Sequence, residues 1–190
     1  DIDDSFFAKA DILYLTGYIL NPESQKPAIK QALSTSKENR IKVIFDVADP
    51  FAVQRYRDAF LTLIEEEADV VFANQAELSI LFDTKDINVA ANSLGRIVNI
   101  AAVKLGKEGC LVIENGNLCK ITSRPIIAKD STGAGDMFAA GFIAALSKGY
   151  SGKAAGKIGG YFAEEIIQIP GAQFEKSVIK QLNVDLPWPK

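Results

Sequence analysis

Short apolar runs alternate along the chain with longer runs in which apolar residues recur at helical spacing. Four short runs are rich in β-branched or aromatic residues and end at turn or capping residues, as buried strands do, at 11–17, 41–48, 68–74 and 99–106. The longer runs carry helix start and stop signals, at 22–40, 50–67 and 75–96. Strands alternating with helices predict a doubly wound, mostly parallel α/β sheet with flanking helices.

The pattern changes in the second half of the chain. Residues 110–122 are predicted to form a β-hairpin that turns at Asn115 and Gly116. Two adjacent helices rich in glycine and alanine, and therefore able to pack closely, are expected at 133–149 and 151–169. The proline-rich stretch 184–190 is expected at the surface. With no linker or repeat in view, we expect residues 1–190 to form a single α/β domain.

Composition narrows the class of protein. Of the 190 residues 48% are apolar and 24% charged, which is ordinary for a globular protein. The net charge of −3 gives no basic field for nucleic acid or acidic membranes, so neither is expected as a partner. No apolar run reaches the roughly 18 residues that cross a bilayer, and the first residues lack a signal-peptide pattern. A cytoplasmic location is therefore expected.

Two residue types bear on the chemistry. Cys110 and Cys119 flank the predicted hairpin turn, but the turn register places Cys119 opposite Val112, so we expect no disulfide. Histidine is absent, which excludes Ser-His and Cys-His mechanisms and histidine-ligated metals. A general base in this sequence is therefore expected to be a carboxylate.

The stretch DSTGAGD, residues 130–136, combines glycines with acids where a loop becomes a helix. Gly133, Ala134 and Gly135 before a helix N-terminus can cradle an anion on backbone amides. The stretch is neither a P-loop nor a dinucleotide fingerprint, because Phe138 stands where the third glycine of the fingerprint would be. A plain helix cap would explain Asp136 in the first turn, but not the small residues before it.

At two other strand ends, polar residues are compatible with a helix cap as well as with a functional site. Asn74 and Glu77 form a capping-box pattern, and they could alternatively hold a water on Mg²⁺ at the carboxyl end of a parallel strand. Considered alone, the cap is the favoured interpretation. Asp49 precedes Pro50 and is interpreted as a helix N-cap with proline in the first turn.

A third strand end carries glycines. Gly106 and Gly109, after Lys104, form either a tight turn or a loop whose amides meet a nucleotide, and the residues alone do not separate these readings. Three such sites, all expected at the ligand edge of one sheet, favour function over independent caps.

These residues, in this order, resemble the ribokinase-like (PfkB) family of carbohydrate and nucleoside kinases. DSTGAGDMFAAGF is similar to the C-terminal signature of the family, with Ser131 in place of the usual threonine. NQAE is similar to its Asn-x-x-Glu motif, KLGKEG to its nucleotide loop, and FAEEIIQIPGAQ to the stretch that closes around the adenine. A weaker resemblance points to the bacterial adenosine-kinase-like branch.

The resemblance implies roles for the phosphoryl-transfer residues. Asp136 would accept the proton of the acceptor hydroxyl, and residues 133–135 would form the anion hole for the transferred phosphoryl group. Asn74 and Glu77 would organise Mg²⁺ through water. Asp130 and Thr132 lie where some members bind a monovalent cation, which makes K⁺ a further candidate beside ATP and Mg²⁺.

The resemblance also implies a nucleotide site bordered by Lys104, Gly106, Gly109 and Gly160. Two of these depart from the common pattern of the family: Lys104 replaces a frequent threonine or serine, and Gly160 a frequent asparagine or histidine. The family's N-terminal portion, with its sugar-binding segment and β-sheet lid, has no counterpart in these residues. The resemblance thus identifies the chain as the nucleotide-binding and catalytic C-terminal portion of such a kinase.

The expected function is an ATP-dependent kinase that phosphorylates a primary hydroxyl of a sugar or nucleoside, the full-length protein being a candidate homodimer. The first alternative is a non-catalytic nucleotide-binding or scaffold domain, because the acceptor-binding portion is not represented. The second is a dinucleotide oxidoreductase, which the lack of a third glycine and of histidine disfavours.

Overall fold

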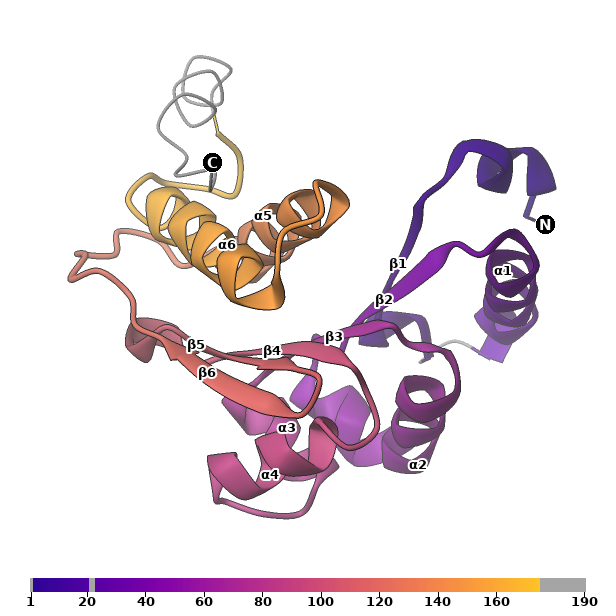
Figure 1. Ribbon diagram of the computed structural model, residues 1–190, viewed down its shortest axis with the longest axis horizontal. Helices are drawn as coiled ribbons and strands as arrows, with labels where there is room; N and C mark the ends of the chain where they lie inside the picture. Colours follow the sequence, from indigo (N-terminus) through magenta and orange to yellow (C-terminus); the bar gives the residue numbers. More distant parts are fainter. Residues whose placement is uncertain (1, 21–22, 175–190) are drawn as a thin grey trace. The chain divides into compact units, whose positions relative to one another are not determined.

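A computed structural model describes residues 2–20 and 23–174 and shows a mixed α/β fold (Figure 1). Six strands form one sheet in the order β1-β2-β3-β4-β5-β6. Their bounds are β1 Ile12–Thr16, β2 Lys42–Asp46, β3 Val70–Asn74, β4 Ile100–Lys104, β5 Cys110–Glu114 and β6 Asn117–Ile121. β1 pairs with β2 in parallel, and β2 pairs with β3 in parallel. The predicted fold class is confirmed for the described residues, while the stretch 184–190 lies outside them.

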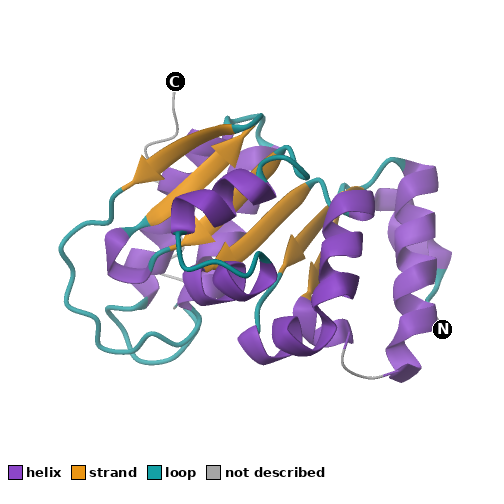
Figure 2. Cartoon of the chain, turned by 90° about the horizontal axis from the view of Figure 1, so that it is seen from below, coloured by secondary structure: helices purple, strands orange, loops and turns teal. Residues whose placement is uncertain are grey.

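Helices alternate with the first four strands along the chain. Figure 2 shows the helices and strands by colour. The α-helices are α1 Lys26–Asn39, α2 Pro50–Glu67, α3 Gln75–Leu81, α4 Ile87–Leu94, α5 Ala134–Ser147 and α6 Gly152–Ile166. Short 3₁₀ helices occur at η1 Asp4–Lys9, η2 Gly17–Leu20, η3 Glu23–Gln25 and η4 Gly106–Glu108. Among the described residues, no helix is both long and apolar enough to cross a membrane.

The run at 75–96, predicted as helical from its spacing, contains two helices, α3 and α4. Asp83 adopts a left-handed conformation with φ of 49°, which an α-helix does not tolerate in its interior. Asp86 then starts α4 as its N-cap, accepting hydrogen bonds from the amides of Asn88 (2.9 Å) and Val89 (3.3 Å). The apolar spacing continues across this break, which is why periodicity alone joined the two helices.

The chain divides into two compact units. The first contains the described residues up to Val103, together with Ile113–Leu118. The second contains Lys104–Val112 and the described residues from Cys119 onward. A single domain over residues 1–190 stays a prediction.

Aromatic and branched side chains fill the core of the first unit. The rings of Phe45 on β2 and Phe60 on α2 meet edge to face with centroids 5.3 Å apart. Gly17 allows close packing here, since a Cβ at this position would lie 2.8 Å from the Phe60 ring and overlap a backbone carbonyl. Other fully buried side chains of this unit are Ile44, Ile64, Phe72, Leu78, Leu81, Leu94 and Ile113.

Glycines bring α5 and α6 of the second unit into close contact, as the composition predicted. A Cβ on Gly141 of α5 would lie 3.0 Å from the Cα of Gly159, and one on Gly159 of α6 would lie 2.7 Å from the Phe138 carbonyl oxygen. A Cβ on Gly156 would lie 2.5 Å from Val112 on β5. The small residues of α6 therefore face both α5 and the hairpin.

The hairpin has the predicted turn. Asn115 and Gly116 both have positive φ, 51° and 76°, which matches the paired left-handed residues of a type I′ turn. Cys110 and Cys119 are both free, so the expected absence of a disulfide between them is confirmed. Burial raises the pKa of the Cys110 thiol to about 12.

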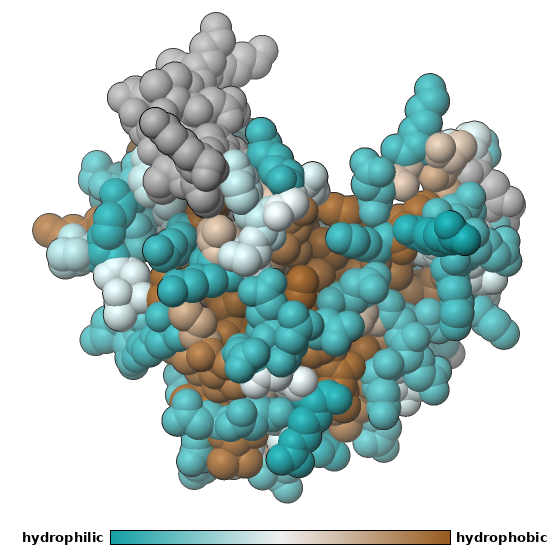
Figure 3. Space-filling model, in the orientation of Figure 1, coloured by the Kyte–Doolittle hydropathy of each residue, from teal (hydrophilic) through white to brown (hydrophobic). Residues whose placement is uncertain are grey.

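Hydrophilic residues cover much of the face seen in Figure 3, with apolar residues visible between them. Six large apolar side chains are notably exposed among the described residues: Phe6, Tyr14, Tyr18, Phe51, Val89 and Ile127.

Candidate active site

A cavity of about 980 Å³ lies within the second unit. The loop after β4, the segment after β6, the first turn of α5 and one face of α6 all contribute to its wall. Six of the residues proposed from the sequence line it together: Lys104, Gly106, Gly109, Ala134, Gly135 and Gly160. Gly133 and Asp136 are not among the lining residues.

Residues 105–109, the two-glycine turn, contain the short 3₁₀ helix η4. Its two ends are joined by a hydrogen bond from the Leu105 amide to the Gly109 carbonyl at 2.8 Å. Gly106 and Gly109 both have positive φ, 59° and 92°. Gly109 is also restricted sterically, because a Cβ there would overlap the Ile121 carbonyl oxygen and lie 2.8 Å from the Ser123 nitrogen. The turn interpretation is confirmed, and the same turn forms part of the cavity wall.

The signature loop, residues 130–133, ends at Gly133. This glycine has φ of 78° and is the N-cap residue of α5. The first-turn amides of an α-helix have no acceptor within the helix, so Gly135 and Asp136 carry amides suited to an anion. Lys104 adds a positive charge at this point, because a Cβ on Gly135 would lie only 3.6 Å from the Lys104 Nζ. The side chain of Asp136, in the same turn, is exposed.

Asp130 ties the signature loop to the segment after α6. Its Oδ1 accepts hydrogen bonds from the Thr132 amide at 2.9 Å and the Thr132 hydroxyl at 2.7 Å, and its Oδ2 accepts one from the Gly171 amide at 2.9 Å. These bonds, the Thr132 hydroxyl first, lower the pKa of Asp130 to about 2. The neighbouring residue Ala172 approaches Gly133 so closely that a Cβ there would lie 2.8 Å from it.

Basic side chains dominate the charged lining of the cavity. Six of its lining residues carry positive charge: Lys104, Lys107, Lys120, Arg124, Lys153 and Lys157. Glu164 is the one acidic residue among the described residues of the lining. Such a wall suits a ligand with several negative charges.

Sequence reasoning singled out only Lys104 among these cations. A signal for part of the set was present in the sequence, because Lys153, Lys157 and Tyr161 follow one another at intervals of four on α6 and so share one face. Lys107 and Lys120 offered no comparable local pattern.

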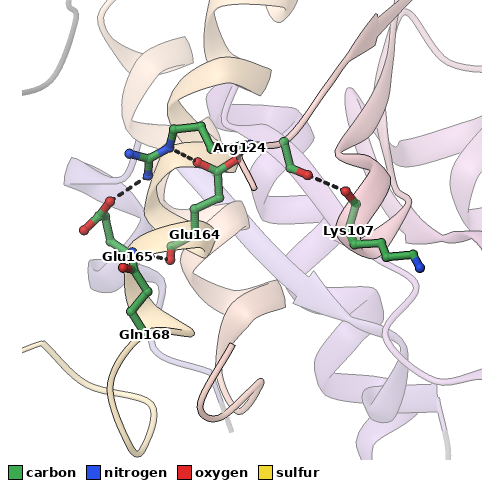
Figure 4. Close-up of polar contacts among 6 residues, drawn as sticks. Lys107, Arg124, Glu164, Glu165 and Gln168 are labelled. Carbon is green, nitrogen blue, oxygen red and sulfur yellow. Dashed lines mark hydrogen bonds and ion pairs between the residues drawn. The ribbon is translucent and has the colours of Figure 1, made fainter. Parts of the chain in front are cut away.

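Arg124, in the segment after β6, is joined to α6 by several contacts (Figure 4). Its backbone amide donates to Glu164 Oε1 at 2.9 Å, its Nε forms an ion pair with Glu164 Oε2, and its terminal nitrogen reaches Glu165 at 2.6 Å. The guanidinium also lies 4.8 Å from the ring centroid of Tyr161. The hydrogen bond to Glu165 is the largest cause of the raised pKa of Arg124.

Asn74 and Glu77, in the first unit, form a complete capping box. The Glu77 amide donates to Asn74 Oδ1 at 2.9 Å, and the Asn74 amide donates to Glu77 Oε2 at 2.7 Å. The Asn74 side chain donates to the other carboxylate oxygen, and Glu77 is only 2% exposed. The cap interpretation is confirmed.

The capping contacts of Asn74 and Glu77 bear on how this pair could contact Mg²⁺. Carboxylate and amide oxygens are ligand types that Mg²⁺ accepts. Both oxygens of Glu77 are already engaged by Asn74, so the pair fits contact through water better than direct coordination. Among the described residues, no group of three or more acidic, cysteine or histidine side chains is placed to hold a metal.

The capping interpretation of Asp49 is confirmed too. Its side chain accepts a hydrogen bond from the Phe51 amide at 2.9 Å, and Pro50 occupies the first turn of α2. Nearby Asp46, at the end of β2, is buried and accepts hydrogen bonds from the Tyr14 hydroxyl and the Ala48 amide, both at 3.2 Å.

Comparison with known proteins places this chain in a family. Residues 1–178 match the family described as pfkB family carbohydrate kinase. The chain is 29% identical over 180 residues to an uncharacterized sugar kinase from Archaeoglobus fulgidus, covering 91% of this chain and 67% of that protein. It is 34% identical over 145 residues to an ATP-dependent ribose-1-phosphate kinase from Halopiger xanaduensis, covering 76% and 44%.

A crystal structure of adenosine kinase from Sinorhizobium meliloti has the same fold. The TM-score is 0.91 at 31% identity, and the match covers 97% of this chain and 57% of that one. The chain thus spans about half to two thirds of the length of the proteins it matches. With the family match extending over nearly all of its residues, this chain belongs to the pfkB family of carbohydrate kinases.

Proposed function

We propose that the protein transfers the γ-phosphoryl group of ATP to a primary hydroxyl of a sugar or nucleoside. The cavity of the second unit is the observation that carries this proposal. It combines a two-glycine turn, the amides at the start of α5 and a lining rich in lysine, which together suit the phosphates of a nucleotide.

Each part of the site has a role in this proposal. The turn at Gly106 and Gly109 borders the nucleotide, and Gly160 leaves open space on the face of α6, since a Cβ there would meet nothing within 4 Å. Gly133–Gly135 at the start of α5 hold the phosphoryl group in transfer, with the Lys104 ammonium beside Gly135 as a second source of positive charge.

Asp136 is the proposed base. Its carboxylate is exposed in the first turn of α5, where an acceptor hydroxyl can reach it. Phosphoryl transfer proceeds through a loose transition state, so catalysis is mostly positioning and electrostatic stabilisation, and the base need accept the proton only late. A carboxylate can serve in that role although its ordinary pKa is near 4.

Two ions complete the proposal. Mg²⁺ would neutralise charge between the phosphates, with Asn74 and Glu77 contacting it through water. K⁺ would bind near Asp130 and Thr132, where the pKa of about 2 keeps the Asp130 carboxylate ionised at physiological pH. Turnover measured with K⁺ replaced by a large organic cation tests the second assignment, and unchanged turnover would rule it out.

A non-catalytic nucleotide-binding domain is the second candidate. It is favoured by one observation: the chain spans about half to two thirds of the length of its relatives. A phosphorylation screen separates the two. The full-length protein and the chain of residues 1–190 are each incubated with Mg²⁺–ATP and a panel that includes ribose, fructose and adenosine. Product from the full-length protein supports the kinase, while ATP binding without any product supports the second candidate.

A further inference from the structure

Arg124 connects two walls of the cavity. It lies in the segment after β6, and its partners Tyr161 and Glu164 on α6 both line the cavity. Figure 4 shows the pairing with Glu164. The same segment also contacts the two-glycine turn, because the hydroxyl of Ser123, the residue before Arg124, donates a hydrogen bond to the Lys107 carbonyl. One short segment therefore links the turn to α6.

The contacts of Arg124 differ from an ordinary surface ion pair. Exposed pairs with one contact contribute little, because water screens them and both side chains lose freedom. Glu164 is instead fixed by two contacts to the same residue, one from the backbone amide and one from the guanidinium, and its side chain is only 13% exposed. The Tyr161 ring restricts the guanidinium further.

The pairing of Arg124 with Glu164 changes the charge that the cavity presents to a ligand. Glu164 is the one acidic side chain among the described lining residues, and its charge opposes the binding of a polyphosphate. Arg124 pairs with that carboxylate as well as with Glu165, which does not line the cavity, so the wall at α6 presents an ion-paired Glu164 rather than a lone negative charge. The Glu164 side chain is largely shielded from solvent whereas that of Arg124 is 49% exposed, so the pairing is screened less than one in which both side chains are exposed.

We propose that Arg124 is a positioning residue for the nucleotide: it neutralises Glu164 and fastens the segment after β6 to α6, without contacting the nucleotide. This rests on the proposed function, because it assumes that the cavity binds a nucleoside triphosphate. It extends that function to residues outside the family-like motifs.

Charge compensation can be tested in the full-length protein with Arg124→Gln and the double variant Arg124→Gln/Glu164→Gln. The first leaves the Glu164 carboxylate with the backbone amide but without a positive partner, while the second also removes the charge at position 164 and keeps an acceptor oxygen there for that amide. Glu165 loses the guanidinium in both variants, so their comparison isolates the charge of Glu164. The dissociation constant of Mg²⁺–ATP is measured by calorimetry, and KM for ATP and kcat by a coupled assay. Arg55→Gln is the matched control, since Arg55 also lies over a neighbouring ring, that of Tyr56 at 5.2 Å, but in the first unit.

For Arg124→Gln we expect the dissociation constant and KM for ATP to rise about three- to tenfold, with kcat within about twofold of the wild type. The double variant should regain most of the lost affinity, and Arg55→Gln should behave as the wild type. Arg124→Lys keeps the positive charge but not the planar guanidinium with its several donors. Its dissociation constant for ATP should therefore lie between those of the wild type and Arg124→Gln. If Arg124→Gln does not fold, as thermal unfolding would show, Arg124→Lys and the double variant carry the test.

Two results would overturn the positioning role. ATP affinity unchanged in Arg124→Gln would show that the pairing does not matter to the site. A double variant that binds ATP no better than Arg124→Gln would show that the guanidinium acts by direct contact or by packing, rather than through Glu164. Failure of the proposed function has a different signature, because the wild-type protein itself would then bind no ATP, or would bind it and form no product from any acceptor of the panel.

Discussion

At the scale of single residues, burial and hydrogen bonding decide how the ionisable groups behave. Hydrogen bonds to Asp130 lower its pKa, whereas burial of Cys110 raises its pKa. Thr132, the largest cause of the Asp130 shift, lies only two residues away in the sequence, whereas the Gly171 contact and the burial of Cys110 depend on distant parts of the chain. Gly171, which donates to Asp130, is 41 residues away along the chain.

The stability of the protein should depend on Asp130 at acid pH. Because folding lowers its pKa from 3.8 to about 2, the ionised carboxylate stabilises the folded state above about pH 4, and that stabilisation is lost as the pH falls toward 2. Urea unfolding of the wild type and Asp130→Asn between pH 2 and 5 measures it. The difference in stability between the two proteins should shrink as the pH falls through this window, and a constant difference would contradict the assignment.

The two cysteines should react at very different rates. Cys110 is 2% exposed and its pKa is about 12, so almost none of it is thiolate near neutral pH, whereas Cys119 is partly exposed. Iodoacetamide at pH 8 followed by peptide mass spectrometry should find Cys119 labelled well before Cys110. Denaturant should abolish the difference, and equal labelling of the folded protein would contradict the buried position of Cys110.

At the scale of elements, most strands and helices followed from local pattern. The four strands, the hairpin and α2 were predicted to within a few residues, because apolar spacing and caps such as Asp49 are local signals. The break at Asp83 was missed since it interrupts the backbone but not the apolar period. The pairing of Arg124 with α6 could not be predicted, because its partners are about 40 residues away along the chain.

Packing of α5 on α6 should depend on which glycine is replaced. A Cβ on Gly159 would lie 2.7 Å from a backbone oxygen of α5, while a Cβ on its neighbour Gly160 would meet nothing within 4 Å. Gly159→Ala should therefore lower the free energy of unfolding by about 1–3 kcal/mol, whereas Gly160→Ala should leave it unchanged or raise it by about 0.5–1 kcal/mol. Chemical denaturation compares the two, and equal effects would contradict the close approach of the helices.

At the scale of the whole molecule, the family is shown by a match over nearly all of the chain, and the catalytic assignment is the step that remains a proposal. The residues proposed to border the nucleotide gather in one cavity of the second unit. Asn74 and Glu77 belong to the first unit, where their capping contacts are complete. The phosphoryl-transfer role therefore depends most on Asp136 at the start of α5.

The most direct test compares turnover by the full-length wild-type protein and Asp136→Asn, using an acceptor that the panel identifies, with Mg²⁺–ATP affinity measured in parallel. If Asp136 is the general base, the substitution should lower kcat by roughly 10²–10⁴ and change the ATP affinity little, because the carboxylate acts on the acceptor. Near-normal turnover by Asp136→Asn would contradict the account.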